Sequence, residues 1–128
     1  MAKVGLFHFD LETNRNFGDA ILFNSVKQSF NSFDQSSRFE ITTCHPFRKE
    51  LDDEIINNIN KNCDAVLLRG GGLFIVDSVP NSPSGWQWNC TLDQLDRIKK
   101  PLIFFAVGFN QFRNHKAFPE IFNQHLRT

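Results

Sequence analysis

The sequence predicts a doubly wound, Rossmann-like α/β domain with helices on both faces of a parallel sheet. Four short apolar segments have the composition of buried strands, and amphipathic segments with a helical period alternate with them. Glycines follow two of these strands, at the sheet edge where such folds bind ligands. Because alternating strands and helices form right-handed βαβ units, we expect four parallel strands. Their order is 2-1-3-4 if the chain reverses direction after the second strand.

The predicted strands are continuous apolar runs that end at polar residues, prolines or glycines. Such runs, rather than a strict alternation of apolar and polar residues, are typical of strands buried on both faces of a parallel sheet. The four segments cover residues 3–9, 38–44, 63–68 and 101–107.

Amphipathic stripes predict four helices between and after these strands. Thr91 and Gln94 have the spacing of a capping box, so the third helix is expected to start at Thr91. In the fourth helix, Ile121, Phe122 and Leu126 form the stripe that should face inward. The predicted helices cover residues 19–33, residues 51–62, a segment from Thr91, and a segment that starts near Phe118 with Pro119 as first helical residue.

The composition is that of an ordinary globular protein and excludes several kinds of partner. Among 128 residues, 14 lysines and arginines balance 14 aspartates and glutamates, so the charge gives no reason to expect nucleic acid or an anionic membrane. No apolar run approaches the ~20 residues of a transmembrane helix, and the N-terminus lacks the pattern of a secretion signal. We therefore expect one cytoplasmic domain, residues 1–128, with no transmembrane segment.

Cys44, Cys63 and Cys90 do not have the spacing of a metal site. Their odd number also excludes a fully paired disulfide framework, so buried thiols are the expectation. Neither a GxGxxG nor a GxxxxGK[ST] pattern occurs, which disfavours a nicotinamide or nucleoside triphosphate site. The sequence therefore predicts no metal and no cofactor.

Glycine-containing segments at the predicted sheet edge are the candidates for a binding site. Gly18 and Asp19 open the first helix, where Asp19 is either a structural N-cap or a functional carboxylate. Three glycines follow Arg69, and they predict a turn with positive φ or a bare backbone, either in tight packing or against a ligand. After the fourth strand, Gly108 precedes Asn110 at the same edge.

The stretch from residue 75 to 89 is long and has neither a helical nor a strand pattern. It holds Trp86 and Trp88, whose rings either stack on a sugar or pack in the core or under a lid. His8 lies in an apolar strand and is expected to be a hydrogen-bonded core residue rather than a base. No catalytic triad can be assigned from spacing alone.

Three segments, taken in this order, resemble the polysaccharide pyruvyl transferase family. They are the N-x-G-D helix entry at residues 16–19, the D-x-apolar-G-G-G pattern within residues 64–72, and the apolar strand at 101–107 that ends in Gly108. The match extends along nearly the whole chain. Leu73 after the glycines and Phe109 after Gly108 depart from the family pattern, and both differences bear on the identity of the acceptor.

The resemblance implies the N-terminal half of a two-domain enzyme with a glycosyltransferase-B-like shape. Such enzymes transfer a pyruvyl unit from phosphoenolpyruvate to a sugar or lipid-linked oligosaccharide acceptor in surface polysaccharide biosynthesis. The acceptor would lie against this half and the donor against a C-terminal domain, so residues 1–128 alone are expected to be inactive and to self-associate. The implied catalytic residue is Asp19, and the substrate-binding candidates are Asn16, Gly18, Arg69, Gly70, Gly71, Gly72, Trp86 and Asn110.

Other functions remain open on the sequence. A glycosyltransferase-B-type sugar transferase would share this half and differ in its use of a nucleotide sugar. A noncatalytic α/β binding or signalling module also fits the length, although a receiver-like domain expects an aspartate where Arg69 stands. A glutamine-amidotransferase-like hydrolase is disfavoured because His45 and Pro46 after Cys44 do not fit a nucleophile elbow.

Overall fold

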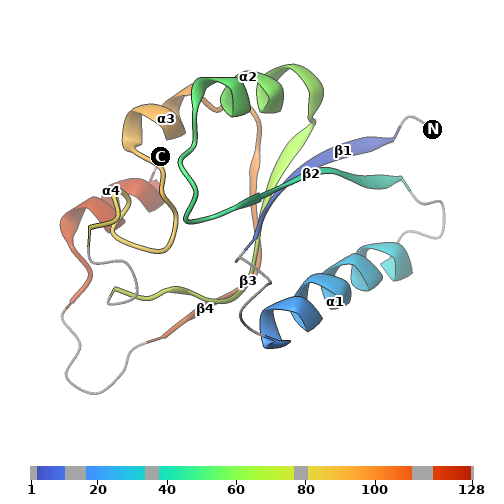
Figure 1. Ribbon diagram of the computed structural model, residues 1–128, viewed down its shortest axis with the longest axis horizontal. Helices are drawn as coiled ribbons and strands as arrows, with labels where there is room; N and C mark the ends of the chain where they lie inside the picture. The colour runs from blue at the N-terminus through green and yellow to red at the C-terminus, as the bar shows by residue number, and fades with distance from the viewer. Residues whose placement is uncertain (1–2, 11–16, 34–37, 77–80, 111–116, 128) are drawn as a thin grey trace.

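The computed structural model has four strands and four helices that alternate along the chain (Figure 1). It describes residues 3–10, 17–33, 38–76, 81–110 and 117–127. In chain order the elements are β1 (Val4–Asp10), α1 (Phe17–Phe33), β2 (Phe39–Pro46), α2 (Asp53–Asn62), β3 (Ala65–Phe74), α3 (Leu92–Arg97), β4 (Leu102–Phe109) and α4 (Glu120–Arg127).

The four strands form one parallel sheet in the order β2-β1-β3-β4, which confirms the predicted topology. Leu6 of β1 pairs with Ile41 of β2 on one side and with Ala65 of β3 on the other. The chain therefore moves outward to β2 and then reverses to β3 and β4, as a doubly wound sheet does. Because the strands are parallel, the segments that follow them all leave from the same edge of the sheet.

Helices cover both faces of the sheet, α1 on one face and α2, α3 and α4 on the other (Figure 1). Successive side chains of a strand point to opposite faces, so Leu6 joins the core under α1 while Phe7 joins the core under the other helices. None of the described helices is both long and apolar enough to cross a membrane. The core under α1 consists of Leu6, Val26, Ala65 and Leu67, and the larger core includes Phe7, Phe9, Ile56, Ile59, Val66, Leu68, Leu95 and Phe122.

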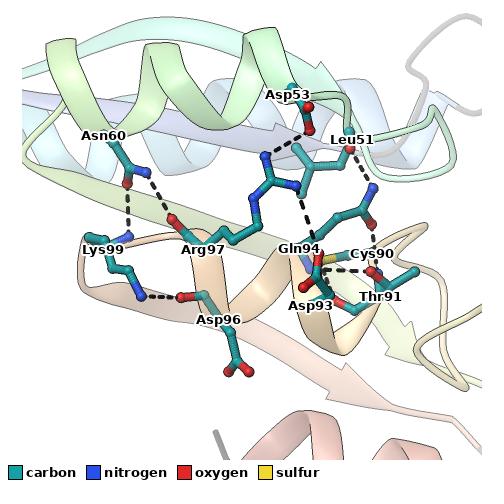
Figure 2. A network of polar contacts seen from close by, with 10 residues as sticks. All are labelled: Leu51, Asp53, Asn60, Cys90, Thr91, Asp93, Gln94, Asp96, Arg97 and Lys99. Atoms are coloured by element: carbon teal, nitrogen blue, oxygen red, sulfur yellow. Dashed lines mark hydrogen bonds and ion pairs between the residues drawn. The ribbon is translucent and has the colours of Figure 1, made fainter.

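Polar contacts fix the short helix α3 against α2 (Figure 2). The Thr91 hydroxyl accepts from the Gln94 amide at 3.2 Å, and Gln94 Oε1 accepts from the Thr91 amide at 2.8 Å, which confirms the predicted capping box. Nε2 of Gln94 also donates to the carbonyl of Leu51 at 2.6 Å. At the other end of α3, Asn60 donates to the carbonyl of Arg97 at 2.8 Å. Backbone groups at both ends of this six-residue helix thus have partners.

The three glycines lie inside β3, so the prediction of a turn after the third strand is wrong. The strand continues through Gly70–Gly72, here called the glycine corner, and stays paired with β4. Gly70 and Gly71 have φ values of +82° and +65°, as expected for glycines in a left-handed conformation. Ala106 lies beside Gly70 in the register of the two strands and also has a positive φ, +52°. Figure 1 shows β3 and β4 changing direction together.

Two helices differ in detail from their sequence patterns. α1 begins at Phe17, so Asp19 lies in its first turn and not at the predicted N-cap position. α4 begins one residue after Pro119, which was predicted to be its first helical residue. In α4, His125 is buried and Leu126 is 43% exposed, so the prediction that Leu126 faces inward is wrong. His125 takes its place because it is hydrogen-bonded within the core.

β4 is an edge strand whose apolar side chains are partly exposed. Its continuous apolar run predicted burial on both faces, yet Ile103 is 37% and Phe104 is 44% exposed. The strand pairs with β3 on one side and contains no charged residue or proline. Charges and prolines commonly protect edge strands from association, and the sequence of β4 contains neither.

Candidate functional site

Two of the three segments that were predicted to form a site, residues 69–73 and 108–110, meet at the glycine corner, and α1 packs beside them through Leu22. A Cβ added at Gly70 would lie 4.0 Å from Cβ of Leu22 in α1. A Cβ added at Gly72 would overlap the side-chain amide of Asn110, whose backbone N–H donates to the carbonyl of Phe74 at 3.0 Å. The first turns of α1, the corner of β3 and the end of β4 therefore adjoin one another at the edge where open parallel sheets bind ligands.

The groups at this corner differ in their exposure. Gly18 in the first turn of α1 and Asn110 after β4 are exposed, whereas Gly71 and Gly72 are half-buried. The backbone of Asp19 follows Gly18 in the same helical turn. Asn16 lies outside the described residues. Exposed amide and backbone groups can bind a polar, uncharged ligand by hydrogen bonds, and the catalytic role of Asp19 stays a prediction.

Arg69 is buried, although the sequence led us to expect it to face a ligand. Only 1% of its surface is exposed, and its Nε donates a 2.8 Å hydrogen bond to Nε2 of His8. His8 is itself fully buried, which confirms its predicted place in the core. Burial, with a further contribution from the charge of Arg69, lowers the pKa of His8 to about 3. The imidazole is therefore neutral and accepts the hydrogen bond of the guanidinium.

His45 and His125 are also buried and hydrogen-bonded. Nε2 of His45 donates to the carbonyl of Glu50 at 3.2 Å, and Nε2 of His125 donates to the carbonyl of Cys90 at 3.0 Å. Burial lowers the pKa of each histidine, and the hydrogen bonds to the carbonyl groups oppose part of that effect. Among the described residues, these histidines join elements of the fold, and none of them presents a general base to solvent.

Trp86 and Trp88 lie in the core, with 0% and 1% of their surfaces exposed. The Trp86 ring lies 5.8 Å from that of Phe47 and 5.1 Å from that of Phe74. Nε1 of Trp86 also donates to Nδ1 of His125 at 3.4 Å, which connects this segment to α4. Of the two interpretations, core packing describes both tryptophans, because neither has a free face on which a sugar could stack.

Two residues that no sequence motif indicated, Arg48 and Gln87, lie next to the glycine corner. Nη2 of Arg48 donates to Oε1 of Gln87 at 3.3 Å, and Nε2 of Gln87 donates to the carbonyl of Gly72 at 3.1 Å. Gln87 is 6% exposed, whereas Arg48 is exposed. Only the position of Arg48 just after a predicted strand could have drawn attention to it, because Gln87 comes from a segment without a pattern.

A cavity of about 520 Å³ lies elsewhere, between α3, α4 and the start of β4. Its lining is mostly apolar and contains none of the predicted site residues. The residues around it include Trp88, Leu95, Lys100, Phe104, His125 and Leu126. This cavity continues into the exposed apolar surface of β4, because Phe104 belongs to both.

The described part of the chain contains no group of three His, Cys, Asp or Glu side chains that could hold a metal ion.

Comparisons with protein-family models found no match to this chain. Comparisons with curated proteins and with solved structures found no similar protein either. The α/β fold with its parallel sheet is compatible with a Rossmann-like domain.

Proposed function

We propose that this domain binds the sugar acceptor of a polysaccharide pyruvyl transferase-like enzyme, in which pyruvate from phosphoenolpyruvate is transferred to the sugar. The observation that carries the proposal is the meeting of α1, the glycine corner and Asn110 at the carboxyl edge of the sheet. These are the segments by which the sequence resembles that family. The donor groups would come from a second domain with a glycosyltransferase-B-like arrangement.

The groups of the glycine corner itself can bind a neutral acceptor through hydrogen bonds. Gly71 and Gly72 are half-buried, and the exposed side-chain amide of Asn110, which packs against Gly72, can donate to and accept from hydroxyl groups. The buried Arg69 is engaged by His8 and does not offer a cation at the surface. Asp19, in the first turn of α1, is our candidate for the base that activates the acceptor hydroxyl.

Binding of sugars to the 128-residue chain tests this proposal. We would titrate the ¹⁵N-labelled protein with glucose, galactose, mannose and N-acetylglucosamine and follow the amide signals by NMR. We expect dissociation constants in the millimolar range, with the largest shifts at Gly70–Gly72 and Gly108–Asn110. Asn110→Ala should weaken binding severalfold, whereas Asn57→Ala on the distant helix α2 should not.

Three results would contradict the proposal. Tight binding of a nucleotide sugar at the corner would favour the glycosyltransferase alternative. Turnover of phosphoenolpyruvate by the 128-residue chain would place the donor site in this domain, because an acceptor-side domain alone lacks the opposite wall that positions the donor. If none of the four sugars shifts the corner signals at 100 mM, the acceptor-binding role is wrong for these sugars and for this edge.

A further inference from the structure

We propose that Arg48 binds an anionic group, a phosphate or a carboxylate, at the carboxyl edge of the sheet. The residue is exposed, and the buried side chain of Gln87 positions it. The side-chain amide of Gln87 links the guanidinium of Arg48 to the carbonyl of Gly72 in the glycine corner. This inference concerns charge recognition by the chain itself and does not depend on the proposed sugar site.

The backbone of Arg48 is held in place directly after β2. The amide of Lys49 donates to the carbonyl of Pro46 at 3.1 Å, which closes a turn around Arg48. Asn89 binds the backbone carbonyl groups of both Phe47 and Arg48. Its backbone amide donates to the carbonyl of Phe47 at 2.8 Å, and its side-chain amide donates to the carbonyl of Arg48 at 3.4 Å. The arginine therefore starts from a defined position, which lowers the entropy lost when a ligand binds.

The guanidinium is oriented by Gln87. Because Gln87 is almost fully buried and its Nε2 donates to the carbonyl of Gly72, its Oε1 is fixed relative to the glycine corner. That oxygen accepts from Nη2 of Arg48, which uses one of the five N–H donors of the guanidinium. The remaining donors form the planar fork that binds carboxylate or phosphate oxygens in pairs.

Arg48 differs from the other well-placed arginines in its partners. Arg97 forms ion pairs with Asp53 and Asp93, and Arg69 is buried against His8. Among the described residues, no carboxylate lies within ion-pair distance of Arg48. An exposed cation that is held by an amide rather than by an acid keeps its full charge for a ligand.

Titration with inorganic phosphate and, separately, with acetate tests the proposal on the 128-residue chain. The readouts are the NMR signal of the Arg48 Nε–H group and the backbone amides of residues 48 and 72. We expect phosphate to bind in the millimolar range and Arg48→Gln to weaken it at least tenfold. Arg48→Lys should restore only part of the affinity, because an ammonium group cannot form the paired hydrogen bonds.

Lys49→Gln is the matched control, because it removes the same charge from the next exposed residue. It should change phosphate affinity less than twofold. If Arg48→Gln and Lys49→Gln weaken binding equally, the attraction is nonspecific and the proposal fails. It also fails if phosphate and acetate both leave the Arg48 Nε–H signal unchanged. Whichever of the two ions binds more tightly identifies the anionic group that the site prefers.

Discussion

Nε of Arg69 lies 2.8 Å from Nε2 of His8, and this hydrogen bond joins the two central strands of the sheet inside the protein. Because a guanidinium only donates, Nε2 of His8 has to accept and cannot carry a proton. Protonation of His8 would place two cations together in a buried site. This relationship makes the stability of the fold depend on pH.

Lowering the pH from 7 to 4 should destabilise the protein through His8. The unfolded chain binds a proton near pH 6.5, whereas the folded protein holds the pKa of His8 at about 3, so this contribution to stability is present above pH 6.5 and is lost as the pH falls. The slope contributed by one such group is about 1.4 kcal/mol per pH unit. His8→Gln keeps an acceptor for Arg69 and should remove this slope in urea unfolding at pH 7, 6, 5 and 4. Parallel pH profiles for both proteins would show that His8 does not titrate in this way.

Gly70→Ala should destabilise the fold by roughly 1–2 kcal/mol, because a left-handed backbone brings the Cβ of alanine too close to the following carbonyl oxygen. Space is not the cause, since the nearest atom to the added Cβ is 4.0 Å away. Ala106→Gly should be neutral or stabilising by up to about 1 kcal/mol, because strain relief exceeds the entropy that glycine adds to the unfolded chain. Gly5→Ala, whose added Cβ has its nearest contact at 3.4 Å and needs no positive φ, is the control. Equal losses for Gly5→Ala and Gly70→Ala in urea unfolding would rule out the backbone explanation.

Thr91→Ala should lower the free energy of unfolding by about 1 kcal/mol, since it removes the cap of α3. Thr91→Ser keeps the hydroxyl group and should retain most of the stability. Gln94→Ala should have a larger effect than Thr91→Ala, because Gln94 also donates to the carbonyl of the buried Leu51 (Figure 2). Thermal unfolding of the three variants measures the order, and a smaller loss for Gln94→Ala would contradict the bridging role of its side chain.

One thiol should react quickly in the native protein. Cys63 and Cys90 are buried as expected, whereas Cys44 is exposed, so the expectation of a buried thiol is wrong there. Burial raises the pKa of the Cys90 thiol to about 12. Reaction with a chromogenic disulfide at pH 8 should release about one equivalent of the coloured thiolate per chain from the native protein. In denaturant, where all three thiols are accessible, it should release about three. Cys44→Ser should abolish the fast reaction. Two or more fast equivalents in the wild-type protein would mean that a buried thiol becomes accessible.

The edge strand β4 should cause the isolated chain to associate as its concentration rises. Ile103 and Phe104 are exposed on this strand, and nothing in its sequence blocks pairing with another strand. Phe104→Lys should shift the protein towards monomer in sedimentation velocity experiments. Ile21→Lys, which places the same charge at another exposed apolar residue, should not. Association that is unchanged by Phe104→Lys but removed by Ile21→Lys would assign the contact to α1.

The elements and their order could be predicted from the sequence, because they depend on local patterns. The apolar runs and helical stripes specify the alternation of strands and helices, and right-handed crossovers give the observed strand order if the chain reverses direction after the second strand. The capping box of Thr91 and Gln94 could also be predicted from a local pattern, because its two residues are three positions apart in the sequence. Three consecutive glycines also indicated positive φ from residue type, which Gly70 and Gly71 adopt.

Tertiary structure decided what surrounds each candidate residue. Arg69 and His8 are 61 positions apart, and only the register of β1 and β3 brings them together and removes the arginine from the surface. Trp86 is buried because Phe47, Phe74 and α4 close around it, and Arg48 is positioned by a glutamine from a segment without periodicity. An apolar run specifies that a strand prefers burial, but the neighbours that bury it come from distant parts of the chain. Within the described residues, β4 pairs with a strand on one side only, which is why its exposure could not be predicted from its sequence.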